Sequence, residues 1–146
     1  IVYVGIESAN EDVLANAHRT IVSNDIQFER VKKIEKSNIK VKCMYILGYP
    51  TDTIESFKET IKYSKKLLSS FAQFSVFTPY PGTPVYDEYK TKINTNKFED
   101  FNQWQLVFNH KNFSNNDVRR LLNKAYVDYY LNPFWILKFL YSKIFK

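Results

Sequence analysis

Cysteine is almost absent from this chain of 146 residues, which contains one, Cys43. A single thiol excludes a disulfide within the chain, and it excludes a zinc or iron–sulfur site built from several thiolates of this chain. Cys43 lies in an apolar stretch, which favours a small buried hydrophobic side chain over a reactive thiol. Glycine and proline are also scarce, at 3 and 5 residues, while 45% of the residues are hydrophobic. This composition predicts a folded chain with a sizeable core rather than a disordered one.

Long apolar runs are missing as well. No stretch reaches the roughly 20 apolar residues that cross a bilayer, and no signal peptide opens the sequence, so we expect a cytoplasmic protein. The net charge is +6, and many lysines fall where an amphipathic helix turns its polar face to water. Nucleic-acid binding is therefore a minor alternative, and it predicts an affinity that falls steeply with salt. The lysines in question are Lys32, Lys33, Lys36, Lys40 and Lys42, and then Lys58, Lys62, Lys65 and Lys66.

One layout, an apolar strand followed by a loop, occurs three times. The clearest copy is a strand from Ile39 or Val41 to Leu47 and a helix that Asp52 and Glu55 begin as a capping box. The other two strands are expected, as buried elements, over residues 1–6 and 71–77. Helix-sized segments separate the strands, so they should lie parallel in one sheet. Three such strands make an incomplete sheet, and we expect the remaining strands before Ile1.

The connecting helices carry recognisable end signals. Ser8 or Asn10 can cap a short helix after the first strand. Asn24, with Gln27 at capping-box spacing, begins a longer helix, which Asn38 ends in a left-handed conformation.

The character of the sequence changes beyond Tyr86, and we divide the chain into residues 1–90 and an aromatic-rich helical extension, 91–146. Ser114 is expected to cap one helix of the extension, and Pro133 to begin the last. That last helix is apolar nearly all round, with lysines interspersed. Two interpretations of it stay open: it packs against the part of the protein that we expect before Ile1, or it rests on a membrane surface.

The loops that follow the three strands are the candidates for a functional site, because the C-terminal ends of parallel strands gather on one face. Glu7 and Ser8 can form hydrogen bonds with the hydroxyls or the ammonium group of a ligand. An equally weighted alternative is that Ser8 is only a helix cap and Glu7 only a surface acid. In the second loop, Gly48 lets the backbone approach whatever lies above the sheet. The third loop, residues 78–84, combines several prolines with Gly82 and should be stiff.

Three motifs resemble those of radical S-adenosylmethionine (radical SAM) enzymes. Residues 4–8 resemble their Gly-x-Glu-Ser strand, residues 46–53 their Leu-Gly-Leu-Pro-Gly-Glu-Thr turn, and residues 77–84 their Pro-Tyr-Pro-Gly-Thr-Pro loop. The aromatic tail, at 104–108 and 129–133, looks most like the cobalamin-binding subgroup. The resemblance implies an α/β fold, the C-terminal part of a partial (β/α)6 TIM-like barrel with parallel strands four to six, and an α-helical C-terminal extension.

The resemblance also implies roles for the three loops. Glu7 and Ser8 would face the ribose or methionine part of bound SAM. The residues that would line its adenine are Ile46, Gly48, Tyr49 and Pro50. The residues that would shape the substrate pocket are Tyr80, Pro81, Gly82 and Thr83. His18 and His110 have no metal-ligand neighbours at a useful spacing, and we interpret both as ordinary polar residues.

The cluster motif of the family, Cys-x3-Cys-x2-Cys, does not occur in this sequence. The resemblance therefore implies that the ligands of a 4Fe-4S cluster, and the domain for cobalamin where it is used, lie outside this chain, in a missing N-terminal half. The implied chemistry is reductive cleavage of SAM to a 5′-deoxyadenosyl radical that acts on a small-molecule substrate. Cobalamin-dependent methylation is one outcome of this chemistry. A lipid-like compound is one option for the substrate. This chain would supply walls for SAM and substrate and would be inactive alone.

A second hypothesis comes from a different class of protein. The chain is then a non-catalytic remnant or an interaction subunit, and it pairs with its partner through the exposed strand edge at residues 1–6. Peripheral membrane contact through the last helix is compatible with either hypothesis.

Overall fold

The computed structural model describes residues 1–144 and is an α/β arrangement built on one sheet. The sheet contains three parallel strands in the order β1–β2–β3: β1 (Val2–Glu7), β2 (Val41–Leu47) and β3 (Phe71–Val76). The three expected strands and their parallel pairing are confirmed. They form an open sheet, so their numbering as strands four to six of a barrel stays a prediction, as does the division of the chain at residue 90.

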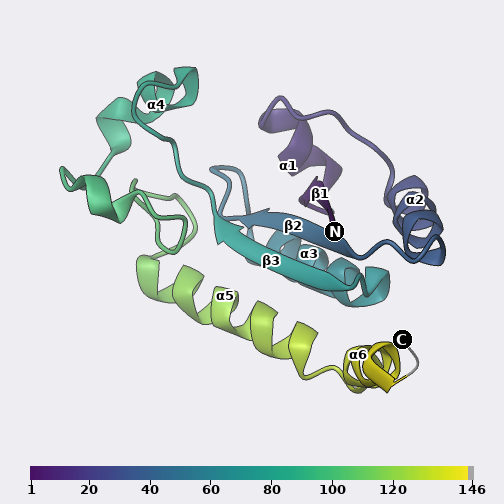
Figure 1. The fold of residues 1–146 in the computed structure, drawn as a ribbon. Helices are drawn as coiled ribbons and strands as arrows, with labels where there is room; N and C mark the ends of the chain where they lie inside the picture. The colour runs from purple at the N-terminus through teal and green to yellow at the C-terminus, as the bar shows by residue number, and fades with distance from the viewer. Residues whose placement is uncertain (145–146) are drawn as a thin grey trace.

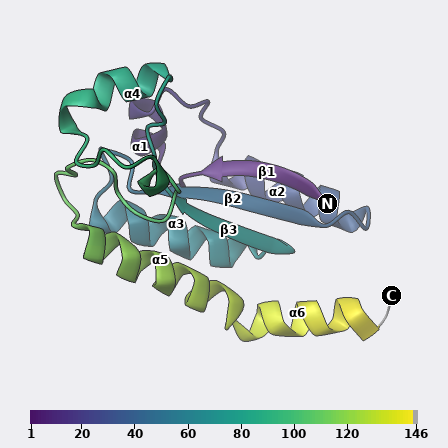
Figure 2. The ribbon, with the colours of Figure 1, turned by 60° about the vertical axis from the view of Figure 1, so that its left-hand side comes forward.

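Helices cover one side of this sheet. Figures 1 and 2 show α2, α3 and α5 along that side, with α4 beyond the C-terminal ends of the strands and α6 near their N-terminal ends. The helices are α1 (Glu11–Asn16), α2 (Asn24–Lys36), α3 (Ile54–Leu67), α4 (Pro84–Tyr89), α5 (Asn115–Tyr130) and α6 (Pro133–Ile144), and two short 3-10 turns are η1 (Lys90–Lys92) and η2 (Phe98–Asp100). None of the helices in residues 1–144 is long and apolar enough to cross a membrane.

The two faces of the sheet differ in burial. Along β2 the side chains alternate strictly, with Cys43 and Tyr45 fully buried toward the helices and Met44 and Ile46 only partly buried on the other face. β3 alternates in the same way. The interpretation of Cys43 as a small buried side chain is confirmed. The half-covered face is the one that a barrel would turn inward.

The expectation that residues 1–6 are buried is wrong for most of β1. Val2 and Tyr3 are exposed, and Ile6 is the buried side chain of the strand. The reason is that β1 lies at the edge of the sheet, where β2 is its one partner. The opposite edge, on β3, is covered by α5, whose Tyr130 hydroxyl bonds the backbone of Ala72.

Several predicted helix ends are confirmed. Asn10 caps α1 by accepting a hydrogen bond from the N–H of Val13, and Ser114 caps α5 in a capping box with Asp117. Asn38 follows α2 with φ of 61°, the left-handed conformation expected of it. Pro133 is the first residue of α6.

Two predicted caps are wrong by one residue. Ser23, not Asn24, caps α2, because the Asn24 side chain donates instead to the carbonyl oxygen of Ala9. Thr53 caps α3 in a capping box with Ser56, so the expected pair of Asp52 and Glu55 does not form. The Asp52 side chain turns into the interior instead, with consequences for the candidate site.

Candidate functional site

Glu7 ends β1 in an unusual backbone conformation. Its φ of 68° is left-handed, and the register between β1 and β2 shifts between Gly5 and Glu7. A non-glycine residue in this region costs about 1–2 kcal/mol, which the surroundings must offset. The bend brings the carboxylate back over the strand, so that a Cβ at Gly5 would lie 3.2 Å from Oε1 of Glu7. Gly5 therefore leaves the space that the Glu7 carboxylate uses.

Tyr49 holds the Glu7 carboxylate from the second loop. Its hydroxyl donates to Oε2 of Glu7 at 2.6 Å, and the Arg19 guanidinium lies 3.7 Å from the same oxygen. Burial, together with the carboxylate as acceptor, raises the pKa of Tyr49 well above its ordinary value, so the phenol stays a donor. The Glu7 side chain is 24% exposed, so the carboxylate is both oriented and reachable from solvent.

Asp52 shapes the turn that carries Tyr49. Its Oδ2 accepts hydrogen bonds from the backbone N–H groups of Gly48 and Tyr49, at 2.8 and 3.0 Å, and its Oδ1 accepts from the Ser56 hydroxyl at 2.6 Å. Burial raises the pKa of Asp52, and these hydrogen bonds oppose that shift. Gly48 has φ of 76°, which suits glycine. The turn is thus closed by a buried carboxyl group rather than by a surface cap.

A distant segment clamps the same turn. His110 Nδ1 accepts from the backbone N–H of Asn112, so Nε2 carries the proton that bonds the carbonyl oxygen of Tyr49 at 2.7 Å. The Asn112 side chain donates to the carbonyl oxygen of Asp52 at 2.8 Å. The sequence interpretation of His110 as an ordinary polar residue missed this role. No local pattern could have found it, because 61 residues separate His110 from Tyr49.

Ser8 does not point toward the open face of the sheet. It is buried, with its hydroxyl oxygen 3.2 Å from that of Thr60 on α3, and it accepts from the backbone N–H of Asn10. The interpretation of Ser8 as a helix cap is wrong, because Asn10 caps α1; Ser8 instead supports the start of that helix through the N–H of Asn10. Its hydroxyl is engaged away from Glu7.

The third loop forms the start of α4, a helix that the sequence analysis did not anticipate. Thr83 caps it by accepting from the N–H of Tyr86, and Pro84 takes the first helical position, a readable signal. Tyr80, Pro81 and Gly82 are exposed. None of the four residues 80–83 lines the pocket beside the second loop; α4 reaches it instead.

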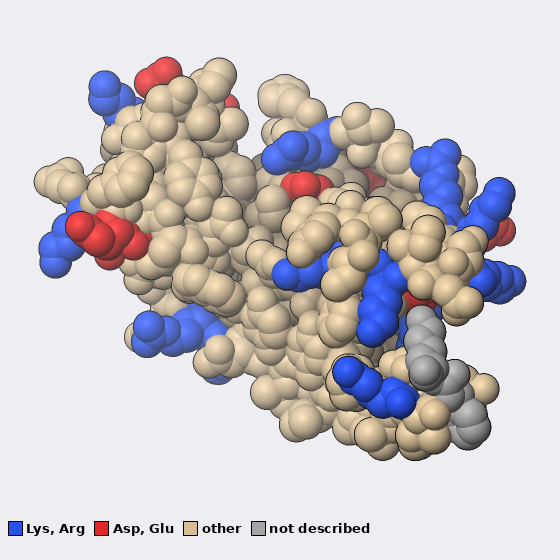
Figure 3. Space-filling model, viewed as in Figure 1, with Lys and Arg blue, Asp and Glu red and all other residues tan. Residues whose placement is uncertain are grey.

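A pocket of about 280 Å³ lies between the end of α1, the second loop and α4. Tyr49 and Pro50 line it, whereas Ile46 and Gly48 do not. Arg19 borders this pocket and a second one of about 250 Å³ that Gly5 and Glu7 line. Figure 3 shows the region as a hollow in the surface between α1 and α4. The other residues around the first pocket are Asn16, Ala17, His18, Thr51, Phe77, Val85, Glu88 and Tyr89.

The described residues do not fit a metal cluster. Within 1–144, no group of three or more His, Cys, Asp or Glu side chains is placed to hold a metal ion, and Cys43 is fully buried. The groups that the site does offer are a carboxylate, a half-covered sheet face and loop backbone, which suit hydrogen bonding to an organic ligand.

Known proteins similar to this chain are enzymes that add methyl or methylthio groups, and the chain is enzyme-like by that resemblance. It is 34% identical over 140 residues to an uncharacterized methyltransferase of Pyrococcus horikoshii, a match that covers 94% of this chain and 30% of the relative. It is 29% identical over 110 residues to the bacteriochlorophyllide d C-12(1)-methyltransferase of Chlorobaculum tepidum, covering 74% of this chain and 24% of the relative.

A third relative is a tRNA-2-methylthio-N(6)-dimethylallyladenosine synthase of Ehrlichia ruminantium, 26% identical over 118 residues and covering 75% of this chain and 26% of the relative. The chain therefore spans 24–30% of the length of these curated relatives. No protein-family model matches it.

Proposed function

We propose that this chain supplies part of the SAM and substrate walls of a radical SAM enzyme that methylates or otherwise modifies its substrate. One observation carries the proposal: the Glu7 carboxylate, held by the Tyr49 hydroxyl in a strained turn, lies at the C-terminal edge of the sheet. This is the end of a parallel sheet at which α/β enzymes bind their ligands. The resemblance to radical SAM motifs implies that Glu7 contacts the ribose or methionine part of SAM.

The similarity to methyltransferases and to a methylthio-adding synthase supports the same class of reaction. It favours modification of an organic substrate over a purely structural role. Cobalamin-dependent methylation is the finer form of this proposal, which the aromatic tail of the sequence favours. The substrate is a small molecule, with a lipid-like compound as one option.

The residues present fit SAM in part. A carboxylate such as Glu7 accepts hydrogen bonds from ribose hydroxyls or from an ammonium group. Ile46 is partly buried on the half-covered face and would offer apolar surface to an adenine. Gly48, Tyr49 and Pro50 follow in the second loop, and their backbone would lie beside the same adenine. Ser8 does not belong to this set, because its hydroxyl is engaged with α3.

Within the proposed site, this chain binds and orients, and it supplies no electron. A bound 4Fe-4S cluster and SAM would together supply the radical chemistry, and Glu7 and the second loop would hold SAM in place for it. The cluster ligands, and a cobalamin domain where one is used, then belong to other parts of the whole protein. Glu7 would fix the orientation of SAM, and Tyr49 would keep the Glu7 carboxylate in place. The wall toward the substrate would come from residues 80–83 and from α4, which they begin.

The unequal edges of the sheet support a missing half as the partner. The edge of β3 is covered by α5, whereas β1 has exposed side chains at Val2 and Tyr3 and one strand neighbour. A further parallel strand can add at β1 alone, which is the side where a partial barrel needs it. The same edge would serve the second candidate function, an interaction subunit without catalysis.

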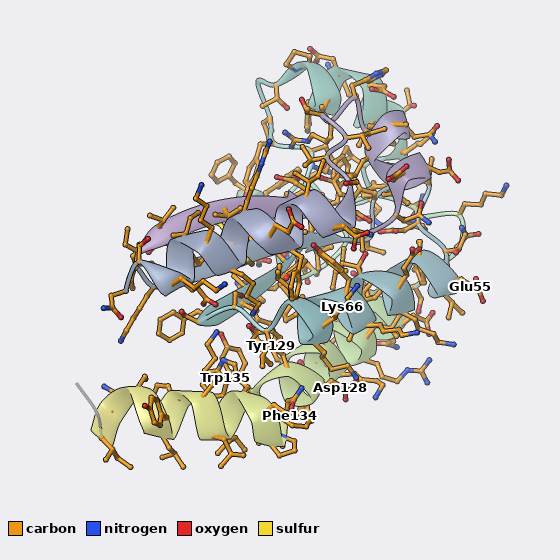
Figure 4. The ribbon with its side chains drawn as sticks, turned by 90° about the vertical axis from the view of Figure 1, so that its right-hand side faces the viewer. Glu55, Lys66, Asp128, Tyr129, Phe134 and Trp135 are labelled. Carbon is orange, nitrogen blue, oxygen red and sulfur yellow. The ribbon has the colours of Figure 1, made fainter. Side chains whose placement is uncertain are left out.

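Measuring SAM binding to the full natural protein, kept anaerobic, tests the proposal. Glu7→Gln keeps the size of the side chain but removes the charge, and we expect it to weaken SAM binding by about tenfold or more, the effect of losing a hydrogen bond to a charged group. Glu55→Gln is the matched control, since Glu55 is exposed at the outer end of α3 (Figure 4). Equal SAM affinity in the natural protein and in Glu7→Gln would contradict the role of Glu7.

The second candidate predicts a different result. An interaction subunit would show no SAM binding in any variant, and it would co-purify with a separate polypeptide. Substituting the edge residue Tyr3 by Pro would then disrupt that complex, because it removes a backbone donor on the side away from β2, whereas the N–H of Val2 already bonds the carbonyl oxygen of Lys40.

A further inference from the structure

The last helix, α6, is fixed to the body of the molecule along one face. The Trp135 indole N–H donates to the carbonyl oxygen of Ser70 at 3.2 Å, and its ring packs edge-on against Tyr130 at 4.7 Å between centroids. Lys138 donates to Glu35 at 2.8 Å and to the carbonyl oxygen of Leu68 at 2.7 Å. These contacts set the rotation of α6 about its own axis.

The opposite face of α6 is apolar and uncovered in the part of the chain that the structure describes. Phe134, Leu137 and Ile144 are 71%, 64% and 71% exposed and follow one another at helical spacing. Figure 4 shows Trp135 on the side of α6 toward Tyr129, and Phe134 on the far side. A contiguous exposed patch of large apolar side chains marks an interaction surface. Its further members are Leu131, Ile136 and Leu140.

The surroundings of this apolar face are basic. Residues 133–144 contain no acidic residue, and Lys143 is exposed. Residues 30–42 contain six basic side chains and one acidic one, Glu35, which is already paired with Lys138 and Lys32. A groove of about 410 Å³ joins the two regions, with Lys40 on one wall and Trp135 on the other. In Figure 3 the Lys and Arg side chains gather on the right-hand side, over α2 and α6.

We propose that α6 and these neighbouring lysines dock the protein on a membrane surface with anionic headgroups. The exposed apolar face enters the interfacial layer, and the lysines contact the headgroups. The helix has 12 residues and thus a length of about 18 Å, so it lies in the plane of the membrane rather than across it. A nucleic acid would complement the positive charge of these lysines but would not cover the apolar face of α6. An acidic protein surface would likewise leave that face exposed to water.

This docking leaves the candidate site free. α6 borders the N-terminal ends of β2 and β3, whereas the Glu7 and Tyr49 side chains lie at the C-terminal ends of their strands. The proposal therefore stands independently of the proposed SAM site.

Co-flotation of the full natural protein with lipid vesicles tests this proposal. Vesicles of phosphatidylcholine mixed with phosphatidylglycerol should bind the protein at least about tenfold more tightly than vesicles of phosphatidylcholine alone. The double variant Leu137→Ser, Ile144→Ser should lose at least about tenfold in binding to the mixed vesicles, because it removes apolar area that the membrane would bury. Lys143→Gln should lose about fivefold, the effect of one lysine near an anionic surface.

A matched control uses exposed apolar residues elsewhere. The double variant Ile21→Ser, Ile54→Ser changes the connection before α2 and the start of α3, away from this face, and should bind as the natural protein does. Absence of binding to either vesicle, equal binding to both, or undiminished binding of the Leu137 and Ile144 variant would each overturn the proposal. The first of these results is expected if a second copy or another protein covers α6. Lys143→Gln, a surface change, keeps the test decisive if the double variant fails to fold.

Discussion

The hydroxyl of Tyr126 on α5 bonds both backbone groups of Phe74 at the outer edge of β3. It donates to the Phe74 carbonyl oxygen at 2.8 Å and lies 3.1 Å from the Phe74 nitrogen, whose N–H it accepts. Tyr130 does the same for Ala72, at 2.7 and 3.1 Å. Four residues along a helix span about 6 Å, and two residues along a strand span about 6.6 Å. The spacing of the two tyrosines on α5 therefore nearly equals the spacing of alternate residues on β3.

This arrangement replaces a fourth strand on that side of the sheet. An edge strand with unpaired N–H and C=O groups invites pairing with another chain, and proteins cover such edges in various ways. Here the covering groups are phenols from a helix. β1 has no equivalent cover in residues 1–144, and this asymmetry is why we assign any further strand to the β1 side.

Removing these hydroxyls should destabilise the chain. Tyr126→Phe and Tyr130→Phe each leave one backbone donor and one acceptor without their partner, and we expect each to lower the free energy of unfolding by about 1–2 kcal/mol. Urea unfolding followed by circular dichroism measures this. Tyr3→Phe, which removes a hydroxyl from an exposed side chain on β1, is the control and should change the free energy little. Equal stabilities of all three variants would mean that water replaces the phenols at no cost.

Two glycines with left-handed backbones allow a paired test of the second loop. Gly48 and Gly82 have φ of 76° and 85°, so alanine at either position should cost about 1–2 kcal/mol in backbone strain. A Cβ at Gly82 would meet no atom within 4 Å, whereas one at Gly48 would lie 3.4 Å from Leu106 and 3.7 Å from Val76. We therefore expect Gly48→Ala to destabilise at least as much as Gly82→Ala in thermal unfolding. A clearly smaller loss at Gly48 would contradict the tight packing of the turn.

The order of the strands and of the helices other than α4 could be predicted because it depends on local patterns. Asn38 and Ser114 ended and began helices as expected, since a left-handed stop and a side-chain cap need only nearby backbone. The start of α3 shows where such patterns fail. Asp52 with Glu55 and Thr53 with Ser56 offer two capping pairs one residue apart, and the amides of Gly48 and Tyr49 decide between them by drawing Asp52 inward.

The candidate site was predictable in its location and not in its details. The strand ends identified Glu7 and the second loop, and the structure joins them through the Tyr49 hydroxyl. The orientation of Ser8 depends on Thr60, and the support of the second loop depends on His110, both far along the chain. Contacts over such separations leave no periodic trace in the sequence.

The clamp from His110 should control how often the second loop opens. His110→Ala removes the hydrogen bond to the Tyr49 carbonyl oxygen, and we expect amide hydrogen exchange in residues 48–52 to accelerate by about tenfold. Hydrogen exchange with mass spectrometry measures the rate by segment. His18→Asn is the control, because His18 is exposed and asparagine tolerates its left-handed φ of 52°. Exchange in residues 48–52 that is unchanged by His110→Ala would show that Asp52 and Asn112 hold the turn without His110.

Asp128 provides a test by pH of how α5 is attached to α3. It lies on α5 beneath α3 (Figure 4), 3.5 Å from Lys65 of α3 and 3.1 Å from Lys124. Burial alone would raise the pKa of Asp128, but the hydrogen bond from Lys124 and the charges of both lysines outweigh it, and the pKa falls below its ordinary value of 3.8. The charged form is therefore favoured in the folded state. Its contribution is fully present above the unfolded pKa and is lost as the pH falls through the lowered folded pKa.

Asp128→Asn should therefore destabilise the chain at pH 7 by about 0.5 kcal/mol, a small amount because Lys124 is exposed and Lys65 partly exposed, so water screens both pairs. The difference from the natural chain should shrink toward zero as the pH falls from about 5 to about 2, since the natural carboxylate is then protonated as well. Urea unfolding at a series of pH values measures it. Asp25→Asn, at a side chain that is 90% exposed, should show no difference at any pH. A loss in Asp128→Asn that persists undiminished at low pH would assign the effect to packing rather than to charge.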